Sequence, residues 1–323
     1  GPDDTALLSR TGYYDRWRYD WRLYQPIVHF ARDRNIPIIA LNISSEIVKR
    51  VSKVGWDGLT AVELAQVPQS VDRTNKNYEE RLREIFRQHP KSTAVDNPHT
   101  GDAGAKKTMQ NAVGMHGVDK QPNPHGADSQ AGREAAAFER FVDVQLLWDE
   151  SMAERAAGYV AEHPERTLVV LAGSGHLAHG DGIPDRVRRR ISVDTAIILP
   201  IHSVADDIES VPADADNIAD FLLVSGNRAL PPPGMLGVML GTDAEGVRVA
   251  SLAPRSAAGA VGVKEGDRMV RIDGRAIETM ADIKLALWDK RPGDRVSVDI
   301  YRADRLADES TSGQEMRFEV ELR

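Results

Sequence analysis

The residues best suited to chemistry gather around a glycine-rich run, Gly173-Ser174-Gly175-His176, with His179 three positions further on. Glycines that directly follow an apolar run let the backbone turn sharply or approach a ligand closely. An imidazole can accept a proton, donate a hydrogen bond or coordinate a metal ion. Two interpretations of His176 therefore stand side by side. It is a ligand or donor at a binding site, or it caps the turn by bonding to backbone.

A second group lies about thirty residues upstream, where Gln145, Asp149 and Met152 follow one another at helical spacing. Phe141 and Trp148 occupy neighbouring positions, so these polar groups share a partly apolar helix face. Polar side chains on such a face must find hydrogen-bond partners. They either hold the glycine-rich loop in place or belong to the same site.

Tyr78 stands at helical spacing from apolar residues that include Leu82 and Ile85. This pattern predicts an amphipathic helix with a core tyrosine. The alternative is a phenolate ligand for ferric iron, a hard ion that suits an oxygen donor. Arg81 lies near enough in the sequence to meet a carboxylate of the same ligand.

The pattern of helices and strands that must position these residues predicts an α/β fold. Short apolar runs predict buried strands, and between them helical spacing and capping residues predict helices. Thr60 with Glu63 three residues on predicts a capping box. Because strands alternate with helices, we expect a mixed or parallel sheet flanked by helices. The strands are expected at residues 36–41, 168–172, 193–201 and 221–224, and the main helices at 24–35, 44–53 and 134–163.

Composition excludes several kinds of site. The 323 residues contain no cysteine, which excludes disulfides, zinc–thiolate sites, iron–sulfur clusters and a thiol nucleophile. The net charge of −8 argues against a general nucleic-acid partner. No apolar run is long enough to span a bilayer. Gly1-Pro2 is typical of a protease scar, so a targeting segment with a lipid-anchored cysteine would have been removed.

Residues 91–132 differ in kind, because they contain no Phe, Tyr, Trp or Glu and are dominated by small and polar residues. This composition predicts a long mobile insertion. The insertion holds His99, His116 and His125, whose spacing is too wide for a standard zinc pattern.

The C-terminal part is a separate module after a stiff linker, Ala229-Leu230-Pro231-Pro232-Pro233. Its run Gly266-Asp267-Arg268-Met269-Val270-Arg271-Ile272-Asp273-Gly274 resembles a PDZ domain of the bacterial periplasmic-protease type. The resemblance implies a small α+β or β-barrel-like domain that adds a peptide to a sheet edge. It implies that the peptide-binding residues are Met235, Leu236, Gly237, Val238, Met239 and Lys284. The alternative is a module that packs only against its own first domain.

The order of the earlier motifs resembles the ChaN family, haem-binding bacterial lipoproteins of the Tiki/TraB/erythromycin-esterase-like superfamily. The motifs are Tyr24-x-Pro26, Ile38-x-Ala40-Leu41-Asn42, Gly55-x-x-Gly58-Leu59-Thr60, Tyr78-x-x-x-Leu82, Gln145-x-x-x-Asp149-x-x-Met152, Gly173-x-Gly175-His176 and Gly180-x-Gly182-Ile183-Pro184-x-Arg186. Two features depart from the family pattern. Its opening strand with a Gly-Glu-x-His turn has no counterpart before Tyr13, so the chain is a fragment or obtains that half elsewhere, and the insertion is additional.

The resemblance implies haem in an apolar pocket, with facing haems in a homodimer. Tyr78 is the first expectation for the iron ligand and His176 the second. His116 and His125 are alternatives from the insertion. The residues expected to contact the cofactor are Tyr78, Arg81, Gln145, Asp149, His176 and His179.

These observations lead to one leading hypothesis and two alternatives. The leading one is a haem-binding protein of the bacterial cell envelope, periplasmic or attached to the outer membrane, for haem or iron uptake. Its expected domains are a ChaN-like domain at 1–228, the linker at 229–233 and a PDZ domain at 234–323 that docks a partner peptide. One alternative is a metal-dependent hydrolase that uses His176, with Asp149 or Glu63 as base. The other is a non-catalytic scaffold.

Overall fold

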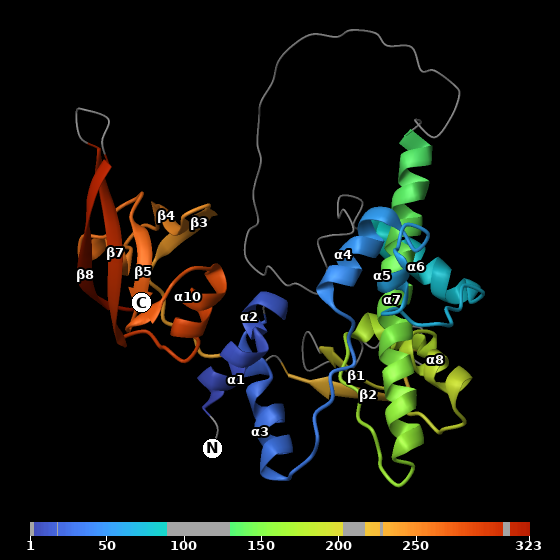
Figure 1. Ribbon diagram of the computed structural model, residues 1–323. Helices are drawn as coiled ribbons and strands as arrows, with labels where there is room; N and C mark the ends of the chain where they lie inside the picture. Colours follow the sequence, from blue (N-terminus) through green and yellow to red (C-terminus); the bar gives the residue numbers. More distant parts are fainter. Residues whose placement is uncertain (1–2, 18, 89–129, 203–216, 227–228, 306–310) are drawn as a thin grey trace. The chain divides into compact units, whose positions relative to one another are not determined.

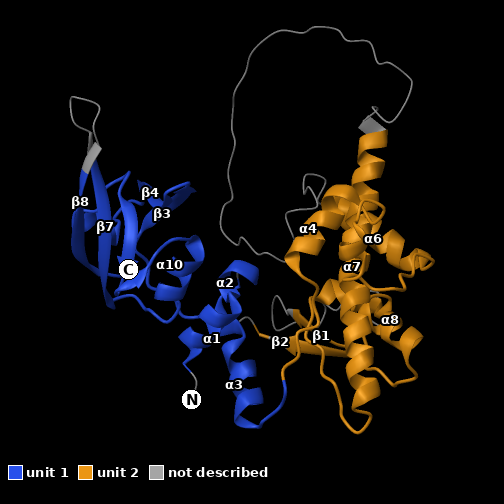
Figure 2. Cartoon of the chain, viewed as in Figure 1, with its two compact units in different colours: residues 1–37, 229–323 blue, residues 38–228 orange. Residues whose placement is uncertain are grey.

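The computed structural model describes residues 3–17, 19–88, 130–202, 217–226, 229–305 and 311–323. The chain divides into two compact units, each with its own core (Figure 2). Unit 1 combines residues 1–37 with 229–323, and unit 2 comprises residues 38–228. The division at 229 coincides with the predicted linker. The first 37 residues, however, pack with the C-terminal module.

Unit 2 is built around one long helix, α7, with shorter helices against it (Figure 1). Ser44 caps α4 by accepting a hydrogen bond from the Ile47 amide, and Thr60 with Glu63 forms the predicted capping box at α5. No helix in the described ranges is both long and apolar enough to cross a membrane. The helices of this unit are α4 (Ser45–Val54), α5 (Ala61–Leu64), α6 (Lys76–Gln88), α7 (Gln130–Glu162) and α8 (Ile183–Arg190), with short 3-10 turns η2 (Ser174–His176) and η3 (Ala178–Gly180).

The core of unit 2 lies along the middle of α7. One side of α7 packs against α4 and α8 through residues such as Val51, Leu147 and Ile183. Another side packs against α6 through Tyr78 and Leu82. Because α7 is covered on several sides, its central turns are buried almost without interruption.

The predicted strands are only partly formed. Strand β1 (Ile198–His202) pairs in parallel with β2 (Phe221–Ser225), which confirms strands in the last two predicted regions. The prediction of buried strands at 36–41 and 168–172 was wrong. Neither segment is part of a strand, and Ile38 and Val169 are 65% and 76% exposed.

A parallel strand is buried only where neighbours supply its ladder and both faces are covered. In the described residues, the carbonyl groups of Leu41 and Asn42 instead accept hydrogen bonds from the Arg155 guanidinium. Leu168 and Val170 still pack on the core of unit 2 with one face. Residues 168–172 therefore keep one half-buried face but form no strand ladder.

Unit 1 contains an antiparallel sheet in the order β3-β4-β5-β7-β8, with β6 paired to β5. Its core includes Val247, Val249, Ile272, Ile300 and Val320. The strands are β3 (Val238–Asp243), β4 (Gly246–Leu252), β5 (Arg268–Ile272), β6 (Arg275–Ala276), β7 (Arg295–Arg305) and β8 (Thr311–Glu321), and the helices of this sheet domain are α9 (Ala257–Ala260) and α10 (Met280–Leu287).

The N-terminal helices of unit 1 pack against α10. Leu8, Tyr14 and Trp21 form a buried cluster with Leu285 of that helix. The Trp288 indole N–H donates to the Thr5 hydroxyl at 3.4 Å. The helices are α1 (Asp4–Thr11), α2 (Tyr13–Arg16), η1 (Trp21–Leu23) and α3 (Gln25–Asp33).

Candidate functional site

The centre of the candidate site is a buried carboxylate, Asp149, which is shared by the side chains of Tyr78 and His176. The Tyr78 hydroxyl donates to Asp149 Oδ2 at 2.7 Å. The Nδ1 atom of His176 lies 2.5 Å from Asp149 Oδ1. An ionised carboxylate only accepts hydrogen bonds, so the His176 proton in this pair sits on Nδ1. All three side chains are buried in unit 2.

Cations surround the phenol ring of Tyr78. The Arg186 guanidinium carbon lies 4.4 Å from the ring centroid, and that of Arg81 lies at 5.5 Å. Burial, and then the charge of Asp149, raise the pKa of Tyr78 well above its usual value, although Arg186 and Arg81 act in the opposite direction. The hydroxyl therefore stays protonated and serves as a hydrogen-bond donor.

The turn that carries His176 is held by backbone and by Arg81. The His176 amide donates to the Gly173 carbonyl at 2.9 Å, so this residue does close the glycine-rich turn. Arg81 donates to the Gly175 carbonyl at 2.8 Å and also pairs with Asp181. Helix α6 thus supplies both Tyr78 and the cation that fixes the loop of its partner histidine.

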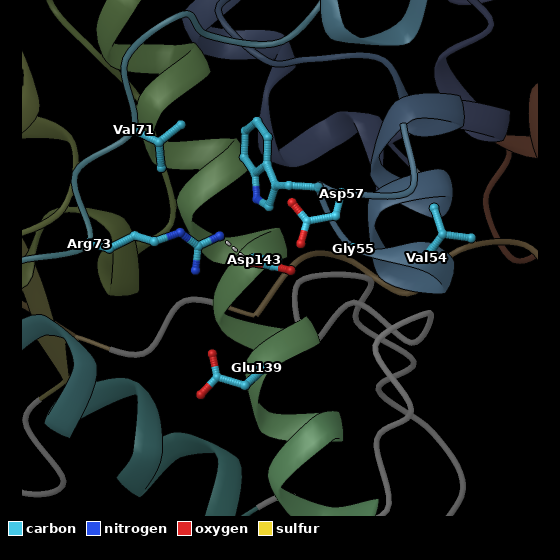
Figure 3. A pocket seen from close by; sticks show the side chains of 8 residues that line it. Val54, Gly55, Asp57, Val71, Arg73, Glu139 and Asp143 are labelled. Atoms are coloured by element: carbon cyan, nitrogen blue, oxygen red, sulfur yellow. Dashed lines mark hydrogen bonds and ion pairs between the residues drawn. The ribbon is translucent and has the colours of Figure 1, made fainter. Parts of the chain in front are cut away.

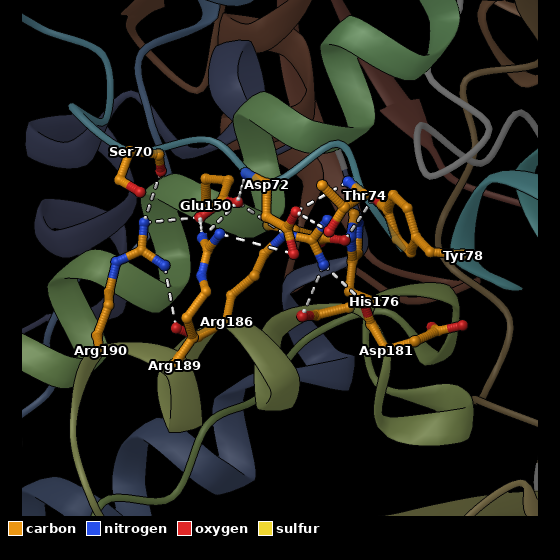
Figure 4. A network of polar contacts seen from close by, with 12 residues as sticks. Ser70, Asp72, Thr74, Tyr78, Glu150, His176, Asp181, Arg186, Arg189 and Arg190 are labelled. Carbon is orange, nitrogen blue, oxygen red and sulfur yellow. Dashed lines mark hydrogen bonds and ion pairs between the residues drawn. The ribbon is translucent and has the colours of Figure 1, made fainter. Parts of the chain in front are cut away.

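A buried ionic network continues from this centre along α7 and α8 (Figure 4). Glu150, next to Asp149, accepts hydrogen bonds from Arg189 and Arg190 and from the Asp72 amide. Arg186 approaches Glu150 at 3.2 Å and donates to the carbonyl groups of Asp181 and Gly182. Burying a charge costs free energy unless partners compensate it, so these contacts lock α8 against α7.

Glu150 and the arginines of α8 are the residues that we did not single out from the sequence for a role, although Arg186 stands in a quoted motif. A usable signal was present. The run Arg188-Arg189-Arg190 ends an amphipathic helix, and Glu150 lies in the most apolar part of α7. A carboxylate at such a position must find cations when the helices pack.

The structure brings together four of the six predicted cofactor contacts, namely Tyr78, Arg81, Asp149 and His176. Gln145 is buried one turn before Asp149 on α7. His179 lies in η3, where it is exposed and has a φ of 61°. His116 and His125, with the insertion around them, lie outside the described residues.

Two hollows lie in unit 2, and the smaller one reaches Tyr78. A cleft of about 510 Å³ is bordered by Trp56, Asp57, Arg73, Glu139 and Asp143 (Figure 3). A smaller hollow of about 140 Å³ is lined by Tyr78 and Leu146 and shares Arg73 and Glu139 with the cleft. Polar and apolar groups therefore meet at the opening nearest to Tyr78. Across the described ranges, no group of three or more His, Asp or Glu side chains has metal-binding geometry.

A second candidate site lies in unit 1, where β3 forms one edge of the sheet. Before β3, Gly237 adopts a φ of 73°, a left-handed conformation that favours glycine. In the described residues, the backbone amides of Leu236 and Gly237 donate to no protein acceptor. Adjacent free amides beside an open strand edge can receive a carboxylate and an added strand. Met235 and Met239 are exposed at this edge, whereas Leu236 is buried, and Lys284 is exposed on α10.

Comparisons with known proteins match the chain to two families. A family model described as "Haem-binding uptake, Tiki superfamily, ChaN" matches residues 2–187, and a PDZ domain model matches residues 234–316. No curated protein matches the chain.

Two solved structures show short matches. The HtrA-type protease AlgW with a decapeptide is 22% identical at a TM-score of 0.24, with 28% of this chain and 30% of that chain covered. An aminopeptidase N family protein from Idiomarina loihiensis is 22% identical at a TM-score of 0.23, with 30% and 15% covered. The chain thus spans less than a third of the length of either protein.

Proposed function

Because the chain belongs to the ChaN family of haem-binding uptake proteins in the Tiki superfamily, with a PDZ domain after it, we propose that it binds haem as cargo at the Asp149 centre and docks a peptide on its PDZ domain. The observation that carries the first part is the position of Asp149 between Tyr78 and His176. This pair supplies two of the kinds of donor, phenol and imidazole, that hold haem iron in proteins.

The contacts divide the roles between the two donors. With Nδ1 bound to Asp149, the His176 ring can coordinate iron only through Nε2, and a carboxylate on Nδ1 makes the imidazole a stronger ligand. Tyr78 would have to lose its proton to bind iron, and its raised pKa opposes that loss. We therefore propose His176 as the first candidate for the iron ligand, and Tyr78 as the donor that positions Asp149.

The surrounding residues fit a dianionic porphyrin. Arg81 is a partly buried cation beside Tyr78, and Arg73 borders both hollows. Each can pair with a propionate through charge-assisted hydrogen bonds. Bound haem supplies the iron that such a protein carries, while the chain's own residues hold, orient and neutralise it.

The test is a haem titration of the full chain followed by absorbance from the Soret region into the visible. We expect saturable binding by the parent protein and a weakened, spectrally altered complex for His176→Asn. His179→Asn is the matched control, because His179 is exposed and asparagine tolerates a positive φ. Tyr78→Phe should keep the ligand spectrum but weaken binding.

Other results would change the assignment. If the parent protein shows a tyrosinate spectrum and Tyr78→Phe abolishes it, the iron ligand is Tyr78. Unchanged affinity and an unchanged spectrum in His176→Asn would remove His176 from the site. An absence of any saturable Soret shift would reject haem binding.

For the PDZ domain we propose that a peptide with a free, apolar C-terminus adds as a strand to β3. The free amides of Leu236 and Gly237 support this mode, since they suit a terminal carboxylate. The measurement is fluorescence anisotropy with a panel of labelled decapeptides ending in Ala, Val, Leu or Phe. The C-terminally amidated peptides should bind at least about tenfold more weakly, because the amide carries no charge for those donors. Equal affinity for both forms would favour an internal segment.

Lys284 offers a protein-side check of the same groove. It is exposed on α10, where it can face an acidic residue of the peptide. Lys284→Glu should weaken binding of a peptide with a glutamate upstream of its terminus, whereas the exposed Lys264 serves as the control when changed to Glu. Identical effects of both changes would show only a general charge effect.

We extend the proposal to location and assembly. An uptake protein of this family would work in the cell envelope, attached through a lipid anchor that precedes the sequence, and would hold facing haems in a homodimer. Fractionation of cells that produce the natural precursor tests the location. Light scattering with and without haem tests the dimer, and a mass that stays monomeric at saturating haem would reject it.

A further inference from the structure

The methionines of this chain are distributed unevenly over the two units. The chain has eight, and Met109 and Met115 lie outside the described residues. Met152 and Met269 are buried in the cores, and Met316 is half-buried. The three others are exposed and all belong to the PDZ domain, with Met239 at 63%, Met235 at 55% and Met280 at 39%.

These three residues lie in the segments proposed to bind the peptide, with Met235 before β3, Met239 in β3 and Met280 at the start of α10. The Gly234 amide donates to the Lys290 carbonyl, so the loop with Met235 lies beside the end of α10. At the other end, the β3–β4 turn at Gly246 lies near the Glu278 carbonyl, just before α10 begins. β3 and α10 therefore run in opposite directions, with Met235 at one end, Met239 on the strand edge and Met280 at the far end.

Helix α10 has three faces, and only one is open. Ile283, Ala286 and Leu287 pack on the sheet core. Leu285, Ala281 and Trp288 pack against the N-terminal helices. Met280 and Lys284, one helical turn apart, remain exposed. The three exposed thioethers thus lie on the segments proposed to bind the peptide, and we call them the rim.

We propose that Met235, Met239 and Met280 are sites of reversible oxidation that control peptide binding; this inference rests on the proposed docking function. A sulfur lone pair takes one oxygen atom from hydrogen peroxide as the O–O bond breaks. The thioether is oxidised to a sulfoxide, and the peroxide is reduced to water. The flexible apolar rim becomes polar. Methionine sulfoxide reductases restore it with a dithiol as reductant: the sulfoxide oxygen leaves as water, and the dithiol is oxidised to a disulfide.

The physical effect follows from desolvation. A peptide strand on β3 covers the rim and removes the sulfoxide oxygens from water. A polar group buried without a hydrogen-bond partner costs enough free energy to raise Kd by about tenfold or more. Before oxidation the same rim favours apolar peptide ends of different shapes, since thioether side chains adapt their conformation to the surface they meet.

The first experiment maps oxidation in the full chain. The protein is treated with dilute hydrogen peroxide, and peptide mass spectrometry follows each methionine over time. We expect Met239 and Met235 to oxidise fastest, Met280 next, and the buried Met269 and Met152 far more slowly. Comparable rates for Met239 and Met269 would overturn the proposal at this step.

The second experiment measures binding of the fluorescein-labelled decapeptide ending in leucine. The oxidised parent protein should bind at least about tenfold more weakly, and treatment with both sulfoxide reductases should restore the affinity. The matched control is the triple variant Met235→Leu, Met239→Leu and Met280→Leu, which keeps an apolar rim and every other methionine. Its affinity should not change with peroxide.

The outcomes separate this inference from the docking function beneath it. Unchanged affinity of a protein with oxidised rim methionines would reject the regulation and leave docking intact. An equal loss of affinity in the triple leucine variant would place the effect at another methionine and also reject it. If no decapeptide of the panel binds before oxidation, docking itself fails, and the regulatory role fails with it.

Discussion

Asp149 is the residue on which the site of unit 2 depends. Its two oxygens serve two different partners, the Tyr78 hydroxyl and the His176 ring. A carboxylate buried in this way is tolerated only when donors compensate its desolvation. The bond from His176 Nδ1 to Asp149 also sets the orientation of the imidazole ring.

We predict that Tyr78→Phe lowers the free energy of unfolding at neutral pH by about 1–3 kcal/mol, because a buried acceptor loses its donor. Since burial raises the pKa of Tyr78, the folded protein holds this proton more tightly than the unfolded chain does. The stabilising contribution is therefore complete below about pH 10 and is lost as the pH rises through the folded pKa.

Urea denaturation of both proteins from neutral to alkaline pH measures this difference. The gap between the two midpoints should be widest near neutrality and should shrink once the pH exceeds about 10. A gap of constant size across the whole range would contradict the assigned titration.

At the scale of elements, the turn between η2 and α8 decides where His176 lies. Gly182 is the glycine that the turn requires, because a Cβ there would overlap the carbonyl group of His176 and lie 3.2 Å from Asp149 Oδ2. Gly175, directly beside the histidine, has nothing within 4 Å of such an atom. The glycine-rich run noticed in the sequence is thus less constrained than the glycine six residues beyond His176.

We predict that Gly182→Ala destabilises unit 2 by about 1–3 kcal/mol, since the backbone must move to relieve the overlap. It should also weaken haem binding, because the displaced backbone carries His176. Gly175→Ala, the control, should change stability by no more than about 0.5 kcal/mol and leave binding intact. Thermal unfolding and haem titration of the two variants provide the measurement. Similar losses in both would show that the whole run, rather than Gly182, sets the position of the loop.

At the scale of the whole molecule, the N-terminal helices belong by packing to the PDZ unit, although the family model begins at residue 2. Leu8, Tyr14 and Trp21 cover the face of α10 that the sheet domain leaves open. Arg22 adds a hydrogen bond to the Pro231 carbonyl in the linker. The compact unit that contains the PDZ domain therefore extends beyond the residues of the PDZ family match.

We predict that Leu8→Ala destabilises unit 1 by about 2–5 kcal/mol, through lost burial and the cavity left behind. Leu7→Ala is the matched control, because Leu7 is 37% exposed whereas Leu8 is 2% exposed. Hydrogen exchange should show faster exchange in α10 for the Leu8 variant only. If α10 keeps its protection there, the N-terminal helices contribute nothing to the stability of the PDZ domain.

Local signals were readable from the sequence alone. The Thr60–Glu63 capping box formed as predicted, since it depends on residues three positions apart. The predicted strands at 36–41 and 168–172 did not form, because an apolar run does not say which neighbour will complete its ladder. The fold class and the PDZ domain were recognisable because their motifs are short and contiguous.

The sequence by itself determined which chemical groups the protein has. It has no thiol, but it has a glycine-rich turn with a histidine, a helix that carries Asp149, and a PDZ module expected to offer a strand edge. Only the tertiary structure decided that Tyr78 and His176, 71 and 27 positions from Asp149, share its two oxygens. It also decided that the first helices cover α10. The physical reason is that periodicity and capping act between near neighbours, whereas the partner of a buried charge or an apolar face is chosen by packing across the whole chain.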